Sequence, residues 1–258
     1  MSETKTGVSA ASGLSGKTTI VVGASRGLGL GVSTALAGAG ASVIAVARTT
    51  PPASSLATGT GTIQTVLADA GDQTTAGRLL GRYEPDTLVL VAGARPHTRP
   101  LQDQTWETFS VNWESDVRIA FLWLREALVK PLRPGSRVIV FSSGAAVMGS
   151  PLSGGYAGAK ATQRFLTTYA QDEARRADLD ITFTAVLPRL TPHTELGRPA
   201  AEAYAARNGQ SVDDYVRSLG EPLTPAGAGS AVVELVGADA ATIAAGYMLT
   251  GAGLRRLE

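Results

Sequence analysis

The stretch T18-T-I-V-V-G-A-S-R-G-L-G29 decides the fold class. Residues 18–22 are all β-branched, which is typical of a strand buried on both faces. Gly23, Gly27 and Gly29 follow directly, and a helical pattern then extends to about residue 39. A strand, a glycine-rich turn and a helix in this order let a pyrophosphate approach the backbone N–H groups at the helix N-terminus. The stretch therefore predicts a dinucleotide-binding βαβ unit.

The same alternation continues along the chain. Short apolar runs predict strands at 42–47, 63–68, 87–91, 136–141 and 181–186, and helical patterns occupy about 74–82, 102–128 and 155–177. Strands without a polar face, separated by helices, are typical of a parallel sheet that is covered on both sides. We predict an α/β fold: a Rossmann-like doubly wound parallel sheet of about seven strands with helices on both faces.

The domain organisation is simple. Residues 1–13 are rich in Ser, Thr, Gly and Ala and are predicted to be a disordered tail, and residues 14–258 are predicted to form a single domain. One excursion, at about 189–224, carries two short helical patterns (199–207 and 212–218) before the sheet resumes near Gly246. An excursion of this length after a strand is expected to be a substrate loop or lid.

Composition excludes several classes of function. The 258 residues carry a net charge of +1, so no strong field favours nucleic acid or anionic lipid. The sequence contains no cysteine and two isolated histidines, which excludes thiolate and histidine metal sites. Neither a signal peptide nor an apolar run of about 20 residues is present. We expect a soluble, cytoplasmic protein whose partner is a small molecule.

The end of the second predicted strand indicates which dinucleotide binds. NAD sites place a carboxylate there for the ribose 2′-hydroxyl, whereas NADP sites provide an arginine for the 2′-phosphate. This strand ends A45-V-A-R48, without a carboxylate. Arg48 and Arg26 therefore favour NADP (NADPH), and NAD stays possible because both arginines could be ordinary surface residues.

Tyr156 and Lys160 are the strongest catalytic candidates. They lie four residues apart in G154-G-Y-A-G-A-K160, so a helix would present both on one face. An ammonium close to a phenol favours the phenolate, which makes the pair a proton donor and acceptor. Taken alone, such a pair also arises by chance.

Together, the glycine turn, Tyr156-x-x-x-Lys160 and a serine thirteen residues before the tyrosine, Ser143, resemble the short-chain dehydrogenase/reductase family. The resemblance covers about residues 14–257. It implies that Tyr156 is the catalytic acid/base, that Lys160 assists it and binds the nicotinamide ribose, and that Ser143 orients the substrate oxygen. It also implies that Asn112 holds a water that links Lys160 to a proton relay.

The family resemblance further implies a set of cofactor contacts. Asp69 would contact the adenine amino group, and V91-A-G93 stands where the family has Asn-Ala-Gly beside the adenosine. The expected cofactor-binding residues are Gly23, Ser25, Arg26, Gly27, Leu28, Gly29, Arg48, Asp69, Ala92, Gly93, Tyr156, Lys160, Pro188, Leu190 and Thr191.

The chain departs from the family pattern at several positions. Val22 replaces a threonine that braces the glycine turn, and Val91 replaces an asparagine that braces the sheet. Arg189 replaces a glycine after the sixth strand, and the threonine that touches the cofactor is either Thr191 or Thr194. None of these changes removes a catalytic group.

These features predict an NADP(H)-dependent oxidoreductase that interconverts a ketone or aldehyde and the alcohol, and a homodimer or homotetramer by family resemblance. Two alternatives remain: an NAD-dependent alcohol dehydrogenase of the same family, and a non-catalytic regulator that senses bound dinucleotide. The substrate is not specified. Arg95, His97, Arg189 and His193 could meet a polar substrate or face solvent.

Overall fold

The computed structural model describes residues 13–52 and 60–257. The predicted N-terminal tail therefore lies outside the described residues, except for Gly13. No helix in these two ranges is long and apolar enough to cross a membrane.

Eight strands form one sheet in the order β3-β2-β1-β4-β5-β6-β7-β8. The parallel strands are β1 (Thr18–Val22), β2 (Ser42–Ala47), β3 (Thr62–Leu67), β4 (Thr87–Leu90), β5 (Ser136–Phe141), β6 (Ile181–Pro188) and β7 (Gly246–Thr250). The strand order reverses between β1 and β4, and the carboxyl edge at such a switch point is where open α/β sheets bind ligands. This confirms the predicted doubly wound fold.

The sheet has one strand more than the predicted number. β8 (Gly253–Arg256) pairs antiparallel with β7 through a tight turn at Thr250 and Gly253. Gly253 has φ +103, a backbone conformation that favours glycine. The strand is too short, and too polar at Arg255 and Arg256, to appear as an apolar run.

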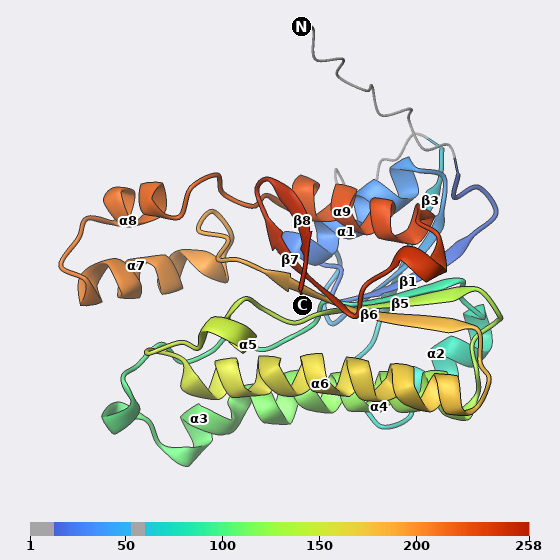
Figure 1. The fold of residues 1–258 in the computed structure, drawn as a ribbon, viewed down its shortest axis with the longest axis horizontal. Coiled ribbons are helices and arrows are strands. Elements are labelled where there is room, and N and C mark those ends of the chain that lie inside the picture. Colours follow the sequence, from blue (N-terminus) through green and yellow to red (C-terminus); the bar gives the residue numbers. More distant parts are fainter. Residues whose placement is uncertain (1–12, 53–59, 258) are drawn as a thin grey trace, which may run out of the picture.

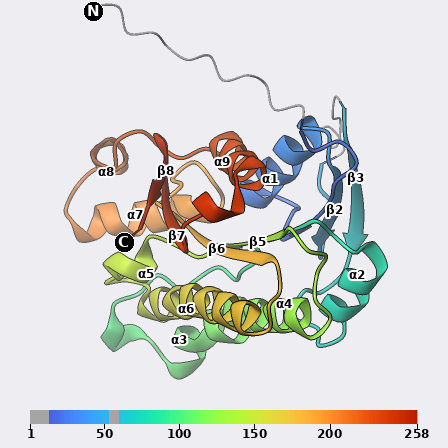
Figure 2. The same ribbon diagram turned by 45° about the vertical axis from the view of Figure 1, so that its right-hand side comes forward.

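Helices cover both faces of the sheet (Figures 1 and 2). α1 (Gly27–Gly38) and α9 (Pro225–Gly237) pack on one face, where Val21, Val43 and Ile139 point into their cluster. α2 (Thr75–Tyr83), α4 (Arg118–Val129) and α6 (Gly154–Arg176) cover the other. Successive residues of β1 thus enter opposite cores, which explains why its sequence has no polar face.

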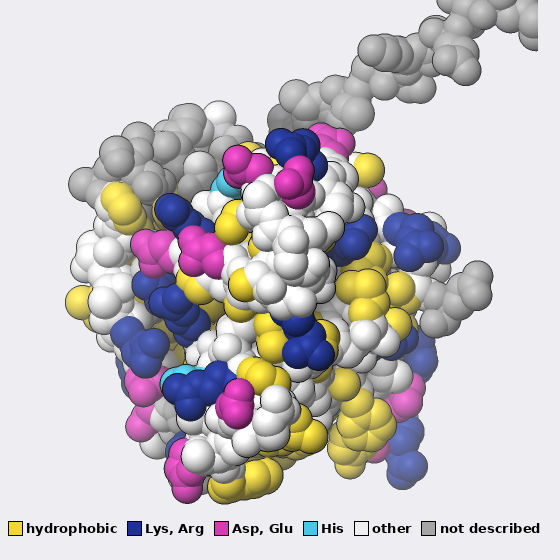
Figure 3. All heavy atoms as spheres, turned by 90° about the vertical axis from the view of Figure 1, so that its left-hand side faces the viewer, with side chains coloured by type: hydrophobic (Ala, Val, Ile, Leu, Met, Phe, Trp, Pro, Cys, Tyr) yellow, Lys and Arg dark blue, Asp and Glu magenta, His cyan; other side chains and the backbone are white. Residues whose placement is uncertain are grey.

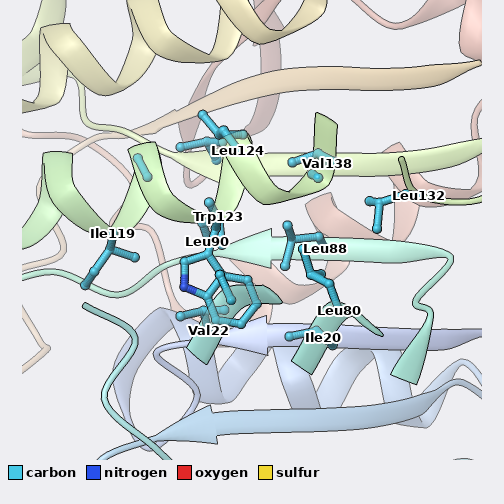
Figure 4. Close-up of a cluster of buried hydrophobic side chains, with 14 of the residues drawn as sticks. Ile20, Val22, Leu80, Leu88, Leu90, Ile119, Trp123, Leu124, Leu132 and Val138 are labelled. Carbon is cyan, nitrogen blue, oxygen red and sulfur yellow. The ribbon is translucent and has the colours of Figure 1, made fainter. Parts of the chain in front are cut away.

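Trp123, on α4, lies in the hydrophobic core between this helix and the sheet (Figure 4). Its side chain is fully buried among Val22, Leu90 and Ile119, and its indole Nε1 donates a hydrogen bond to the carbonyl of Ala70 at 3.1 Å. A buried indole needs such a partner. Trp123 therefore ties α4 to the loop that follows β3.

The predicted helix at 102–128 is interrupted. A short 3₁₀ turn, η2 (Leu101–Asp103), precedes α3 (Trp106–Asn112), and a π turn, η3 (Trp113–Val117), separates α3 from α4. Thr105 and Thr108 form a capping box that starts α3 at Trp106. The π turn inserts an extra residue directly after Asn112, and such insertions are frequent at functional sites.

The segment after β6 forms the predicted pair of helices, α7 (Gly197–Arg207) and α8 (Val212–Ser218), which extend beyond the sheet (Figure 1). α5 (Ala145–Met148), α9 and the 3₁₀ turn η4 (Ala240–Thr242) were not expected from the sequence. Gly229 lets α9 pack closely on α1, because a Cβ there would lie 2.5 Å from the carbonyl oxygen of Gly31.

Candidate active site

The glycine turn lies at the carboxyl ends of β1 and β4. Gly23 has φ +91, and a Cβ on it would lie 2.6 Å from both the nitrogen and the Cα of Ala92. A Cβ on Gly29 would lie 2.0 Å from the carbonyl oxygen of Gly23. Both positions require glycine, and they place Ala92 against the turn.

Backbone bonds hold this turn. The N–H groups of Val91 and Ala92 both donate to the carbonyl of Val22 at 2.9 Å, and the N–H of Gly23 donates to Val46 at 2.8 Å. Val22 itself is fully buried in the core. The turn thus keeps its shape without the side-chain brace that the family has at that position.

The start of α1 remains open toward a ligand. Gly27 has φ +53, and nothing lies within 4 Å of a Cβ built on it. Ser25 and Leu28 are partly buried and Arg26 is exposed. Free backbone N–H groups at a helix N-terminus are the groups that bind a phosphate, so this end of α1 fits a dinucleotide.

The two arginines expected near the ribose differ in their surroundings. Arg48 is exposed directly after β2. Arg26 forms an ion pair with Glu195 of the segment after β6, with Nη1 and Oε2 3.0 Å apart and both side chains largely exposed. Asp69 is exposed after β3, and its Oδ1 accepts the N–H of Gly71 at 2.9 Å, which braces a turn.

The two serines after β5 have different roles. Ser142 is buried, and its hydroxyl donates to the carbonyl of Lys160 at 2.7 Å. Ser143 is only partly buried, and its Oγ accepts the N–H of Ala145 at 3.2 Å. Ser142 therefore links β5 to α6, and Ser143 is the serine that can meet a ligand.

α6 carries Tyr156 and Lys160 near its start. Tyr156 is partly buried, and the Lys160 ammonium lies 5.5 Å from the centroid of its ring. The N–H of Gly144, in the loop that carries Ser143, donates to Pro188 at the end of β6 at 2.9 Å. The ends of β5 and β6 and the start of α6 thus form one connected edge.

Lys160 is held in a buried polar cluster. Its Nζ lies 3.0 Å from Asp116 Oδ2 and donates to Gln163 Oε1 at 2.8 Å and to the carbonyl of Phe141 at 3.3 Å. Burial lowers the pKa of Lys160, but the charges of Asp116 and Tyr156 more than offset it, so the pKa lies above its ordinary value. The lysine is an ammonium at neutral pH.

Asn112 belongs to the same cluster. Its amide Nδ2 donates to the carbonyl of Ala94 at 2.9 Å and to Asp116 Oδ1 at 3.3 Å. Asp116 and Gln163 were not singled out in the sequence, although each lies at helical spacing from a predicted residue: Asp116 four after Asn112, and Gln163 three after Lys160.

The segment after β6 begins beside this edge. Thr191 is buried, and the Thr194 hydroxyl donates to its carbonyl at 2.9 Å and accepts the N–H of Gly197 at 3.0 Å. Thr194 therefore shapes the start of α7. Arg189 is exposed and Leu190 is partly buried. Arg95, His97 and His193 are also exposed.

The surface at the end of the molecule that carries α7 and α8 has side chains of both charge signs (Figure 3). Figure 3 shows basic and acidic side chains interspersed there, with hydrophobic side chains between them. Within residues 13–52 and 60–257, no group of three or more His, Asp or Glu side chains could hold a metal ion.

Comparison with known proteins identifies the family. The family model described as short chain dehydrogenase matches residues 17–205. A solved 3-oxoacyl (acyl-carrier-protein) reductase from Agrobacterium tumefaciens C58, with NADP bound, is 26% identical with a TM-score of 0.74, over 93% of this chain and 95% of that chain.

Two further structures share the fold. Levodione reductase is 19% identical with a TM-score of 0.79, over 93% of this chain and 98% of that chain. A short chain dehydrogenase from Mycobacterium avium is 22% identical with a TM-score of 0.74, over 95% and 86%. No curated protein matches the chain significantly. Because the family model spans well over half of the sequence, the chain belongs to the short-chain dehydrogenase family of oxidoreductases.

Proposed function

We propose that the protein reduces a ketone or aldehyde with NADPH, and oxidises the corresponding alcohol in reverse. One contact carries the proposal: the Ser142 hydroxyl bonds to the carbonyl of Lys160 at 2.7 Å. This bond joins the end of β5, which holds Ser143, to the part of α6 that holds Tyr156 and Lys160. Three groups suited to carbonyl chemistry thus lie on connected backbone at the carboxyl edge of the sheet.

Each side chain has a distinct task in this proposal. When bound, the cofactor supplies the hydride. Tyr156 donates a proton to the carbonyl oxygen, and Ser143 donates a hydrogen bond to the same oxygen, on which negative charge grows in the transition state. Lys160 stabilises the phenolate that Tyr156 becomes, because its ammonium lies behind the ring.

The proposed cofactor residues are those of the open turn. Gly23 and Gly29 permit the tight turn, Gly27 leaves open space where the pyrophosphate would bind, and Arg48 would meet the 2′-phosphate of NADP at the end of β2. The NADP bound in the 26% identical reductase supports this choice. Arg26 would have to exchange Glu195 for the phosphate in order to contribute.

Replacing Tyr156 by phenylalanine tests the reaction. General acid catalysis contributes about 10²- to 10⁴-fold, so Tyr156→Phe should lose that much of the rate of NADPH oxidation with a panel of carbonyl compounds. The dissociation constant of NADPH should remain within about threefold of wild type. Tyr169→Phe, an exposed position on the same helix, is the matched control. Undiminished turnover in Tyr156→Phe would refute the assignment.

Replacing Arg48 tests the cofactor. Arg48→Ala should weaken NADPH binding at least about tenfold, since a charge-assisted pair is lost, and should leave NADH binding unchanged. Equal losses for both cofactors would favour the NAD-dependent alternative. Tight cofactor binding without reduction of any carbonyl by the wild type would favour the dinucleotide-sensing regulator.

We also propose that residues 14–258 form one domain that assembles as a homodimer or homotetramer. Large exposed hydrophobic side chains on α3, η3, α4 and α6 support this assembly: Trp106, Trp113, Phe121, Phe165 and Tyr169. Light scattering of the purified protein measures the number of subunits directly, and a monomer at micromolar concentration would refute it.

A further inference from the structure

Asp116 and Lys160 are the only charged side chains that are buried among residues 13–52 and 60–257. They come from different elements, the π turn η3 and α6, and lie 44 positions apart in the chain. Burying a charge is costly unless it is paired and hydrogen-bonded, so this pair requires a physical account.

Asp116 is bound from several sides. Its Oδ1 accepts the N–H of Ala94 at 2.7 Å and the amide of Asn112 at 3.3 Å, while its Oδ2 faces the Lys160 ammonium at 3.0 Å. The backbone carbonyl of Asp116 accepts the amide of Gln163 at 2.9 Å. The carboxylate therefore connects the loop after β4, the π turn and α6.

Gly93 leaves the space for this carboxylate. A Cβ on Gly93 would lie 2.6 Å from Asp116 Oδ2 and 3.0 Å from Oδ1. The position that follows Ala92 is thus matched to Asp116. Val91, two residues earlier, has no polar side chain with which to hold the same loop.

The Lys160 ammonium is neutralised and bound inside the protein. Its Nζ donates hydrogen bonds to Gln163 Oε1 at 2.8 Å and to the carbonyl of Phe141 at 3.3 Å. With Asp116 Oδ2, at 3.0 Å, it forms an ion pair. The other titratable group that faces it is Tyr156, whose ring centroid is 5.5 Å away, and Gln163 and the Phe141 carbonyl are neutral.

We propose that Asp116 is a positioning residue for the reaction: its carboxylate holds the Lys160 ammonium charged and in place behind Tyr156, and couples it to the loop at Ala94. The proposal rests on the proposed function, because it takes Tyr156 as the proton donor. Asp116 touches neither substrate nor cofactor in this role, and it acts through Lys160.

The chain permits a direct test in the apoprotein. It has four lysines, Lys5, Lys17, Lys130 and Lys160, so ¹⁵N-lysine labelling produces four side-chain amine signals, and Lys160→Arg identifies one of them. The Lys160 signal of the wild type should remain that of an ammonium to at least the ordinary lysine value of about 10.4. Titration of wild-type Lys160 before Lys17 would overturn the proposal, and this measurement needs no variant that has to fold.

Asp116→Asn removes the charge and keeps the shape. Without its partner, the buried Lys160 ammonium should lose its proton about 2 or more pH units lower than in the wild type. Asp86→Asn is the matched control, because Asp86 pairs with Lys17 at the same 3.0 Å, but at the amino end of β1 and with the lysine exposed. Lys17 should move by less than about half a pH unit in that variant. If the titration midpoints of Lys17 and Lys160 shifted by the same amount in their respective variants, the proposal would be overturned.

The effect on turnover distinguishes positioning from a merely structural role. About one pH unit above the lowered pKa of Lys160, as measured by the titration, Asp116→Asn should lower kcat for carbonyl reduction at least tenfold, and the loss should shrink as the pH falls below that pKa, where Lys160 regains its proton. A loss of kcat that is independent of pH would overturn the proposal, and so would an unchanged kcat. Reduction by the wild type in the same assay shows that the proposed function itself is intact.

Discussion

Gly155 carries the sharpest structural prediction. A Cβ at this position would lie 1.9 Å from the carbonyl oxygen of Phe109 in α3 and 2.8 Å from its carbonyl carbon. A normal carbon–oxygen contact is about 3.3 Å, so Gly155→Ala must separate α6 from α3 by about 1.4 Å. The obstacle is backbone, which cannot change rotamer. Gly158, on the same helix, has only an ordinary 3.5 Å contact, with the ring of Trp113.

The two alanine substitutions should therefore change the free energy of unfolding in opposite directions. In a helix interior, Gly→Ala gains up to about 1 kcal/mol, which is the result expected for Gly158→Ala. Gly155→Ala gains no more than that and loses about 3 kcal/mol to overpacking against backbone, so its net loss is about 2 kcal/mol. The difference of about 3 kcal/mol corresponds to about 6–12 °C in Tm for a chain of this size.

Thermal unfolding by circular dichroism and steady-state kinetics measure both consequences. Because Gly155 directly precedes Tyr156, moving α6 by about 1 Å should also lower kcat up to about 100-fold. Gly158→Ala should retain wild-type turnover. If Gly155→Ala proved as stable and as active as Gly158→Ala, the close contact between α6 and α3 would be wrong.

Two further predictions concern single side chains. Ser142→Ala should lower the free energy of unfolding by about 1 kcal/mol through its lost hydrogen bond, whereas Ser143→Ala should leave stability within about 0.5 kcal/mol and lower kcat at least about tenfold; urea unfolding and kinetics on both variants check this. Burial raises the pKa of Asp86, but hydrogen bonds from the Thr18 N–H and Lys17 outweigh it and hold the pKa below its ordinary value. Asp86→Asn should therefore be less stable than wild type at pH 7, and the difference should shrink as the pH falls below about 4; equal differences at pH 7 and pH 3 would contradict this.

Sequence patterns over a few residues predicted the strands well. β1, β2 and β5 have the predicted bounds, and β3, β4 and β6 differ from them by one or two residues, because continuous apolar runs identify strands buried on both faces. The prediction of one continuous helix over residues 102–128 was wrong. A π turn interrupts it, and such a turn depends on packing and leaves no mark in the spacing of apolar residues. α9 was missed because its small residues reflect contact with α1 and not helix propensity.

The candidate site divides in the same way. The glycine turn and the spacing of Tyr156 and Lys160 are readable in the sequence, because a turn that needs positive φ requires glycine and residues four apart share a helix face. The catalytic and cofactor-binding assignments of all the site residues remain predictions. Ser143 was predicted to be the functional serine, and its neighbour Ser142 is buried and bonded to the carbonyl of Lys160.

The sequence by itself determined the alternation of strands and helices, the glycine turn, and the four-residue spacing that places Tyr156 and Lys160 on one helix. Only the tertiary structure decided what surrounds them: Asp116 beside Lys160, Gly155 against Phe109, and Glu195 on Arg26. The physical reason is the separation along the chain of the residues that interact. Periodicity and turn chemistry act over a few residues, whereas these contacts join segments brought together by a sheet whose strand order differs from their order in the chain.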